Sequence, residues 1–306
     1  MTNQGRRARG MDHDLYTYWP DDRRAPWPLP NDARIAVFIL LYIEHWELNP
    51  PSGTYRDPRY QGVYGDFAPD YWRWSYRLYG NRVGIHRVLR VLDQLGIPAT
   101  VAFNAMAVER YPDLVEAVAE RAGWEPVAQG IAATRMITSE MTEEQERRHI
   151  IESQDAVARA FGRRPQGWAG QDYGATARTS RLLAEAGFAY TLDWPNDERP
   201  YRQLADGRLL AVPTQPDWDD VQALWLRHVP LQSYPGLVAE AADELSDSEP
   251  AGRVLCLGLH PWMIGAPHRI AYLRRALSRL QERSDVWFAT AGEIAAQYRA
   301  TCVESI

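Results

Sequence analysis

Polar side chains follow the apolar segments of this sequence at the points where those segments stop. Glu44 and His45 come directly after the run RIAVFILLYI (34–43), and His260 lies near the end of RVLCLGLHP (253–261). A carboxylate and an imidazole can move protons near neutral pH, as general base and general acid. Taken singly, such a glutamate can form an ion pair and such a histidine can be a satisfied core group. Together they predict an acid–base pair at one site.

The same pattern after other segments predicts a polar pocket. Gln129 ends the run WEPVAQ, and its amide cannot transfer a proton, so it either binds a substrate carbonyl or amide or satisfies the backbone. Arg82 can bind a substrate carboxylate or pair with acids of a preceding loop. The segment DWPND (193–197) can contact a substrate or form a turn. The expected substrate contacts are His45, Arg82, Asn104, Gln129, Gln171, Asp193, Trp194, Asn196 and Asp197.

Other catalytic classes find less support. A metal site needs several converging ligands, and no other histidine stands convincingly beside His45 at a segment end. Cys256 lies in mid-strand, and no G-x-S-x-G elbow is present. We therefore expect neither a metal nor a cofactor, although a weak metal site around His45 stays open.

Strand-like and helix-like segments alternate along the chain. The first segment is almost continuously apolar, as in parallel strands covered on both faces. The alternation predicts an α/β protein with a single distorted, TIM-like (β/α) barrel of seven or eight strands. An open doubly wound sheet is the alternative, but no G-x-G-x-x-G follows the first strand. The expected strands are 34–43, 99–104, 125–129, 165–170, 188–194, 208–214, 253–261 and 286–290.

The helices expected between them include 82–96, which stops at Gly96, and 139–161, capped by Thr138 or Ser139. Residues 1–33 are interpreted as an N-terminal arm and 34–306 as one barrel domain. The long aromatic loop 46–81 is expected to be a lid or a subunit contact.

The composition restricts the kinds of partner that this protein is expected to bind. The net charge of −6 argues against nucleic acid, and no stretch is apolar enough to span a membrane. Two cysteines outside any disulfide framework and a polar N-terminus predict a cytoplasmic protein.

Several motifs together resemble a known family, the polysaccharide deacetylase (NodB-homology) superfamily of barrel enzymes, and most closely its branch of metal-independent allantoinases and cyclic-imide hydrolases. The resemblance runs from PNDARIAV to VWFATAGEIAAQY, nearly the whole chain. It implies a NodB-type barrel and a homo-oligomer, a dimer or tetramer. The motifs that carry it include YIEH, YGNRVGIHRVL, GIPATVAFN, RRPQGWAG, AGFAYTLDWPNDERPY and LGLHPWMIGAPHR.

The resemblance assigns roles to particular positions. The catalytic base of the deacetylases falls on Glu44, their adjacent metal-binding acid on His45, and the histidine of their last motif on His260. Their metal-binding histidine pair falls on Gln129 and Ala133, so neither imidazole is present.

The sequence thus predicts a metal-independent hydrolase of a non-peptide C–N bond in a small linear or cyclic amide, imide or ureide. Glu44 would activate water and His260 would protonate the leaving nitrogen, while Gln129, Asn104 or Arg82 would polarise the carbonyl. The alternative is a divergent member that lost hydrolysis and became a binding protein or a biosynthetic enzyme of other chemistry. Deacetylation of a wall polymer ranks third, because the metal ligands and an export signal are missing.

Overall fold

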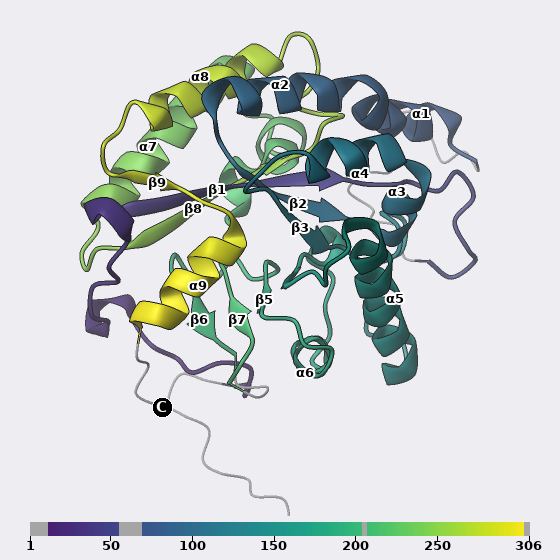
Figure 1. Cartoon of the computed structure of the whole chain (residues 1–306), viewed down its shortest axis with the longest axis horizontal. Helices are drawn as coiled ribbons and strands as arrows, with labels where there is room; N and C mark the ends of the chain where they lie inside the picture. Colours follow the sequence, from purple (N-terminus) through teal and green to yellow (C-terminus); the bar gives the residue numbers. More distant parts are fainter. Residues whose placement is uncertain (1–11, 55–68, 204–206, 303–306) are drawn as a thin grey trace, which may run out of the picture.

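A curled, mostly parallel sheet forms the centre of the molecule, with helices around its outside (Figure 1). The computed structural model describes residues 12–54, 69–203 and 207–302. The strand order is β6-β7-β5-β4-β3-β2-β1-β8, with β9 against the start of β1. Only the β6–β7 pair is antiparallel among the described strands. The strands are β1 (Ile35–Ile43), β2 (Ala99–Phe103), β3 (Glu125–Ala128), β4 (Gly167–Trp168), β5 (Tyr190–Thr191), β6 (Tyr201–Arg202), β7 (Leu210–Ala211), β8 (Arg253–Leu259) and β9 (Val286–Phe288). The predicted barrel is confirmed, and the short strand β6 was not expected.

Helices fill the crossovers between the strands, as parallel pairing requires. Two π-helical segments, Gly80–Gly84 and Val221–Leu226, lie among them. The α-helices are α1 (Tyr71–Tyr79), α2 (Ile85–Leu95), α3 (Ala105–Arg110), α4 (Pro112–Ala119), α5 (Glu143–Phe161), α6 (Thr179–Glu185), α7 (Tyr234–Asp247), α8 (Ile270–Gln281) and α9 (Ala291–Thr301).

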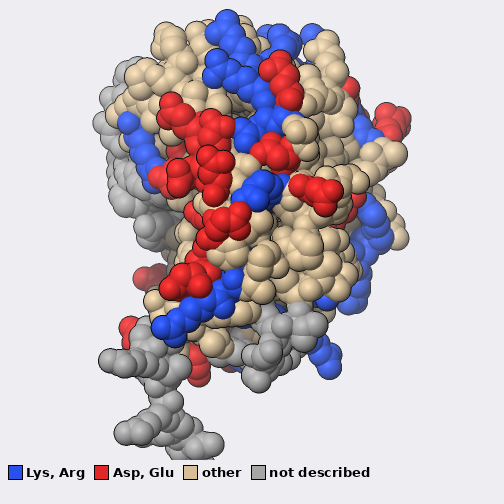
Figure 2. Space-filling model, turned by 90° about the vertical axis from the view of Figure 1, so that its left-hand side faces the viewer, with Lys and Arg blue, Asp and Glu red and all other residues tan. Residues whose placement is uncertain are grey.

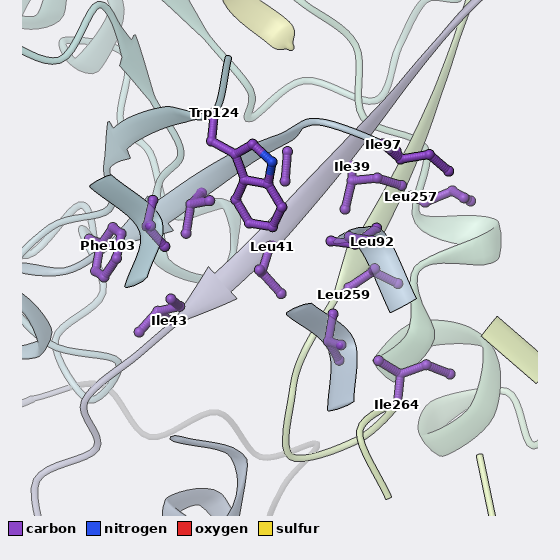
Figure 3. Packing of buried hydrophobic residues seen from close by; sticks show 14 of the residues in the cluster. Ile39, Leu41, Ile43, Leu92, Ile97, Phe103, Trp124, Leu257, Leu259 and Ile264 are labelled. Atoms are coloured by element: carbon purple, nitrogen blue, oxygen red, sulfur yellow. The ribbon is translucent and has the colours of Figure 1, made fainter. Parts of the chain in front are cut away.

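Alternating side chains of β1 pack on opposite faces of the sheet. Odd-numbered residues from Ile35 to Ile43 join a core with α2, α7 and α8 on the outer face. Figure 3 shows Ile39, Leu41 and Ile43 along β1 with Leu257 and Leu259 of β8 on this side. Even-numbered residues, from Ala36 to Tyr42, join a second core inside the barrel. This two-residue period fixes which side chains reach the interior.

The barrel is not closed by a strand pair between β7 and β8. The side chain of Gln215, just after β7, bridges the gap: its Nε2 donates to Val254 O at 2.8 Å and its Oε1 accepts from Cys256 N at 3.1 Å. The amide thus supplies the donor and the acceptor that a neighbouring strand would offer. Nearby, Val254 N donates to Glu198 O.

Helix α9 and part of the N-terminal arm cover the barrel at the N-terminal ends of its strands. Trp27 is buried against Tyr298 of α9, with ring centroids 5.5 Å apart, in the interior core. Figure 2 views the molecule from the side at which β1 begins; basic and acidic side chains are interspersed there, and Arg283 pairs with Asp243 and Asp285. Within the described ranges, no helix is both long and apolar enough to cross a membrane.

Two local predictions need correction. The cap of α5 is Thr142, whose side chain accepts from Gln145 N while the Gln145 side chain accepts from Thr142 N, so Thr138 and Ser139 are not the cap. The predicted loop 46–81 ends earlier than expected, because α1 begins at Tyr71 and runs through the π-helical turn into α2. Residues 55–68 of that loop lie outside the described residues.

Candidate active site

Neighbouring strands deliver Glu44 and His260 to the same end of the barrel. β1 and β8 pair in parallel with Leu41 opposite Leu259, so both chains leave the sheet at the same edge. Tyr42 and Cys256 belong to the interior core, and Glu44 and His260 continue the same even-numbered parity. Both side chains line one cavity at the carboxyl end of the strands. The predicted acid–base pair is therefore brought together.

Two glutamines hold Glu44. Gln129 Nε2 and Gln171 Nε2 each donate to Glu44 Oε1 at 3.0 Å. The side chain of Asn81 donates to the backbone oxygen of Glu44 at 2.7 Å. The carboxylate is 7% exposed, and its Oε2 accepts from no protein donor among the described residues. Because Oε1 is occupied by two N–H groups, Oε2 is the oxygen left for a water molecule.

His260 is paired with Asp220. Its Nδ1 lies 2.7 Å from Asp220 Oδ1, and its backbone N–H donates to Asp220 Oδ2 at 2.8 Å. Asp219 Oδ2 lies 3.9 Å from the same Nδ1. Burial alone lowers the pKa of His260, but the carboxylates of Asp220 and Asp219 outweigh it and raise the pKa to about 9. The imidazole is thus a cation at neutral pH, and Nε2–H is the ring group available to a substrate.

Asp219 fits under β8 because residue 258 is glycine. A Cβ at Gly258 would overlap the Asp219 carboxylate. Asp219 Oδ1 accepts from the backbone N–H groups of Val221 and Gln222, both at 3.0 Å, at the start of the second π-helical segment. Burial, with a further contribution from Asp220, raises the pKa of Asp219 to about 7 although His260 lowers it.

The cavity between these side chains is small, about 20 Å³, which is room for one water molecule. Tyr42 forms one wall and stacks on His260, with ring centroids 4.3 Å apart and planes 16° from parallel. Asp172 and Tyr173 form another and both have positive φ, 48° and 59°. Consecutive non-glycine residues in this region cost free energy, and such strain is concentrated at functional sites. The cavity is lined by Tyr42, Glu44, Gln129, Gly170, Gln171, Asp172, Tyr173, Asp219, Val221, Gln222 and His260.

The π-helical turn Gly80–Gly84 braces both catalytic segments. Asn81 holds Glu44 as described, and a Cβ at Gly84 would overlap the carbonyl oxygen of Pro261, the residue after His260. Arg77 of α1 lies over the ring of Trp262 at 3.3 Å and of Trp46 at 4.7 Å. One helical element thus contacts the chain just beyond each catalytic residue.

Three predicted contacts do not line the cavity. His45 Nδ1 lies 2.8 Å from Tyr111 OH, outside the lining set. Asn104 is the N-cap of α3: its Oδ1 accepts from Ala107 N at 2.9 Å and from His45 N at 3.3 Å. Arg82 is exposed on the π-helical turn. Local capping and chain direction place Asn104 and Arg82 outside the lining of this cavity, and carbonyl polarisation by either residue stays a prediction.

The segment 193–197 bends at Asn196 and contacts the N-terminal arm. Asp197 pairs with Arg24 at 2.7 Å, and Asn196 Oδ1 accepts from Tyr201 OH. The Trp194 ring packs edge-on against Tyr16. Asp193 is buried behind the cavity, where it accepts from Gly170 N and Thr191 Oγ1. Burial raises the pKa of Asp193 to about 6. Asp193 thus supports the cavity wall through Gly170, and none of the four residues lines the cavity.

Sequence reasoning missed Asp219 and Asp220. The doublet follows Trp218 in PDWDD, between the expected strands 208–214 and 253–261. The available signal was a pair of adjacent acids a few residues after the expected strand 208–214 and Pro216, which suits capping of a helical start. Asp220 is forty residues from His260 in sequence, and the two meet only because of the path that the chain takes between β7 and β8.

The metal positions of the deacetylases do not suit a metal here. Gln129 turns its N–H₂ toward Glu44, and Ala133 has no ligand atom. Within the described residues, Asp219, Asp220 and His260 bring possible ligand atoms within 4.8 Å of one another. Asp220 binds the N–H groups of His260 with both oxygens, so a cation there would compete with the proton on Nδ1.

Comparisons with known proteins agree with this architecture. A family model for polysaccharide deacetylase matches residues 79–191. A Schizosaccharomyces pombe protein, provisionally described as a polysaccharide deacetylase, is 28% identical over 90% of this chain and 92% of its own. PuuE allantoinase superposes with a TM-score of 0.80 and 26% identity, covering 95% of this chain and 98% of that chain. A Pseudomonas aeruginosa PAO1 structure, also provisionally described as a polysaccharide deacetylase, superposes with a TM-score of 0.79 and 26% identity. The superposition covers 91% of this chain and 95% of that chain.

The barrel with polar side chains at the carboxyl ends of its strands is the architecture of α/β-barrel enzymes. The chain is thus similar to polysaccharide deacetylases in part of its sequence and to an allantoinase in its fold. These similarities indicate a hydrolase that acts on C–N bonds.

Proposed function

We propose that the protein hydrolyses a C–N bond of a small amide, imide or ureide without a metal, using Glu44 and His260 as its acid–base pair. The observation that carries the proposal is that Glu44, held by two amide N–H groups, and His260, held by two carboxyl groups, line one cavity. Glu44 accepts two amide N–H groups, which suits a carboxylate, whereas Asp220 and Asp219 keep His260 protonated. A base and an acid are thus poised for the same turnover.

The reaction follows from this arrangement. Glu44 Oε2 takes a proton from a water molecule whose oxygen attacks the substrate carbonyl carbon, forming a C–O bond and a tetrahedral oxyanion. His260 Nε2–H then gives its proton to the substrate nitrogen as the C–N bond breaks. Proton transfer from Glu44 to the imidazole, directly or through water, restores both groups.

The developing negative charge needs a stabilising group in place of a cation. His260 is the only cationic side chain among the residues that line the cavity, so it serves as electrophile as well as acid. Gln129 already donates an N–H group to Glu44, so we assign the role of electrophile to His260. The aromatic contact of Tyr42 with His260 keeps the ring in one orientation.

The second candidate, a member that no longer hydrolyses its ligand, is favoured by the loss of imidazoles at Gln129 and Ala133. It predicts ligand binding without turnover. The buried carboxylates and the charged imidazole weigh against it, since such groups destabilise a fold that does not use them.

The decisive experiment is a turnover screen over cyclic imides, hydantoins and linear ureides in the presence of EDTA. Glu44→Gln is expected to lower kcat by about 10²–10⁴-fold, the usual contribution of a general base. Glu109→Gln, at an exposed position of α3, is the matched control and should leave kcat unchanged. Loss of turnover in EDTA that is restored by zinc would contradict the proposal, as would full activity of Glu44→Gln.

A further inference from the structure

Arg77 of α1 is a buried cation that contacts the indole rings of two tryptophans. It is only 7% exposed, so its charge is largely shielded from water. The guanidinium carbon lies 3.3 Å from the ring centroid of Trp262 and 4.7 Å from that of Trp46. A planar guanidinium stacks on aromatic faces, and the attraction is stronger where water is excluded. One cation therefore binds both rings.

The two tryptophans have equivalent positions relative to the acid–base pair. Trp46 is two residues after Glu44, and Trp262 is two residues after His260. Because β1 and β8 are neighbouring parallel strands, the two segments leave the sheet side by side. Arg77 comes from a third element, α1, and links both segments just beyond the catalytic residues.

The segment after β1 is anchored independently of Arg77. Both neighbours of Trp46 in sequence bind to residues 133–135, which follow β3. The backbone oxygen of His45 accepts a hydrogen bond at 2.9 Å, and the carboxylate of Glu47 accepts one at 2.8 Å. The ring of Trp46 is thus attached to a segment that the barrel already holds.

The segment after β8 passes any shift of Trp262 to His260. The backbone N–H groups of Met263 and Ile264 donate to the oxygen of His260 at 2.8 and 3.0 Å. Trp262 therefore lies inside a turn that begins at the catalytic histidine. The rings of Trp262 and His260 are also close, with centroids 6.1 Å apart and planes at 61°. Trp262 packs edge-on against Trp225 of the second π-helical segment, 5.7 Å away.

We propose that Arg77 is a positioning residue for the acid–base pair. Through Trp46 and Trp262 it holds the chain beyond β1 and β8, and thereby the separation of base and acid. Arg77 is not among the residues that line the catalytic cavity, so it acts through its neighbours and not on the substrate. This inference rests on the proposed function and adds a residue to its machinery.

Arg77→Met removes the cation and keeps a side chain of similar length. For the cyclic imide, hydantoin or ureide that is turned over fastest, kcat should fall by about 10–10²-fold, because small misplacements of reacting groups have effects of this size. KM should stay within about threefold, since ground-state binding does not involve Arg77. Arg90→Met, at an exposed position of α2, is the control and should change neither constant. An unchanged kcat in Arg77→Met, or a KM that rises as much as kcat falls, overturns the proposal.

Arg77→Lys tests whether the cation makes the link. Lysine keeps the charge but lacks the planar group, so it should recover part of kcat, at least about threefold over the methionine variant. A lysine variant that is no better than the methionine variant would overturn the link through the cation.

A second measurement needs no substrate. In protein with isotope-labelled histidine, the NMR ring signals of His260 should move in Arg77→Met and return towards their wild-type positions in Arg77→Lys. The ring signals of exposed His228 should stay in place in both variants. Signals of His260 that do not move in a folded methionine variant contradict the proposal.

A further variant keeps the proposal testable if thermal melting shows that Arg77→Met does not fold. Trp46→Phe keeps an aromatic face that binds a cation less strongly than indole does. It should lower kcat by about threefold or more at constant KM and move the His260 ring signals. If kcat and these signals are both unchanged, the link through Trp46 is refuted.

Failure of the inference and of the proposed function can be told apart. Movement of the His260 signals in Arg77→Met, in a protein that turns over no amide, imide or ureide, would remove hydrolysis and keep the positioning. Turnover that depends on Glu44, with unchanged kcat in Arg77→Met, would keep hydrolysis and remove the positioning.

Discussion

His260 is a histidine whose charge is set by its neighbours. Asp220 binds both its ring Nδ1 and its backbone N–H, and Asp219 lies close behind. Although burial lowers the pKa, these carboxylates raise it from 6.5 to about 9. A raised folded-state pKa means that the charged pair stabilises the fold below pH 6.5, and this contribution is lost as the pH rises through about 9. The same titration controls the proton that His260 donates.

We therefore predict that kcat falls above about pH 9 in the wild type and that Asp220→Asn moves this descending limb toward pH 6.5. The physical reason is the loss of the nearest negative charge, which favours the neutral imidazole. The pH profile of kcat measures the shift, and NMR titration of the His260 ring checks it independently. Asp247→Asn, exposed at the end of α7, serves as control. A descending limb that stays in place in Asp220→Asn would show that His260 is not the acid.

At the scale of elements, the helical run from α1 through the π-helical turn to α2 contacts the segments that follow both β1 and β8. Asn81 binds the backbone of Glu44, and Gly84 packs against Pro261 without space for a side chain. π-helical turns inside helices often lie at functional sites. Here the turn lets one helix contact the segments after both β1 and β8, which fixes the separation of base and acid.

Gly84→Ala is expected to destabilise the protein by about 1–3 kcal/mol, because the added methyl group must displace the Pro261 carbonyl. It should also lower kcat, since Pro261 adjoins His260. Gly236→Ala in α7 is the control: nothing lies within 4 Å of its added methyl group, so stability should stay the same or rise by up to about 1 kcal/mol. Urea unfolding and kcat are the measurements. Equal behaviour of the two alanine variants would refute the role of this close packing.

At the scale of the whole molecule, the barrel lacks a strand pair between β7 and β8, and a side chain bridges that gap. Gln215 satisfies Val254 O and Cys256 N across the gap between β7 and β8. It also holds β8, the strand that leads to His260, against the other side of the sheet. The open seam leaves room for the segment that carries Asp219 and Asp220.

Gln215→Ala is expected to cost about 2–4 kcal/mol of stability, because a buried backbone donor and a buried backbone acceptor both lose their partner. Gln281→Ala removes an exposed bond to Leu95 O and should change stability by about 0.5 kcal/mol or less. Chemical denaturation of both variants gives the comparison. A loss at Gln215 no larger than that at Gln281 would mean that the seam is not closed by this side chain.

The sequence by itself determined the features that follow from local periodicity. The alternation of strands and helices, the apolar run of β1 and the αL stop at Gly96 are encoded within short segments. Successive side chains of a strand point to opposite faces of the sheet. The inward projection of Glu44 and His260 could therefore be predicted from their positions in the sequence. Their meeting at one cavity then followed from parallel pairing.

Only the tertiary structure decided what surrounds these two groups. Asn104 caps α3, Arg82 is exposed, and 193–197 contacts the arm, because each depends on where the chain goes after its strand. Asp219 and Asp220 reach His260 through a crossover whose course no local pattern specifies. The charge of His260 is thus a property of the fold, since electrostatic partners are chosen by distance in space and not by distance along the chain.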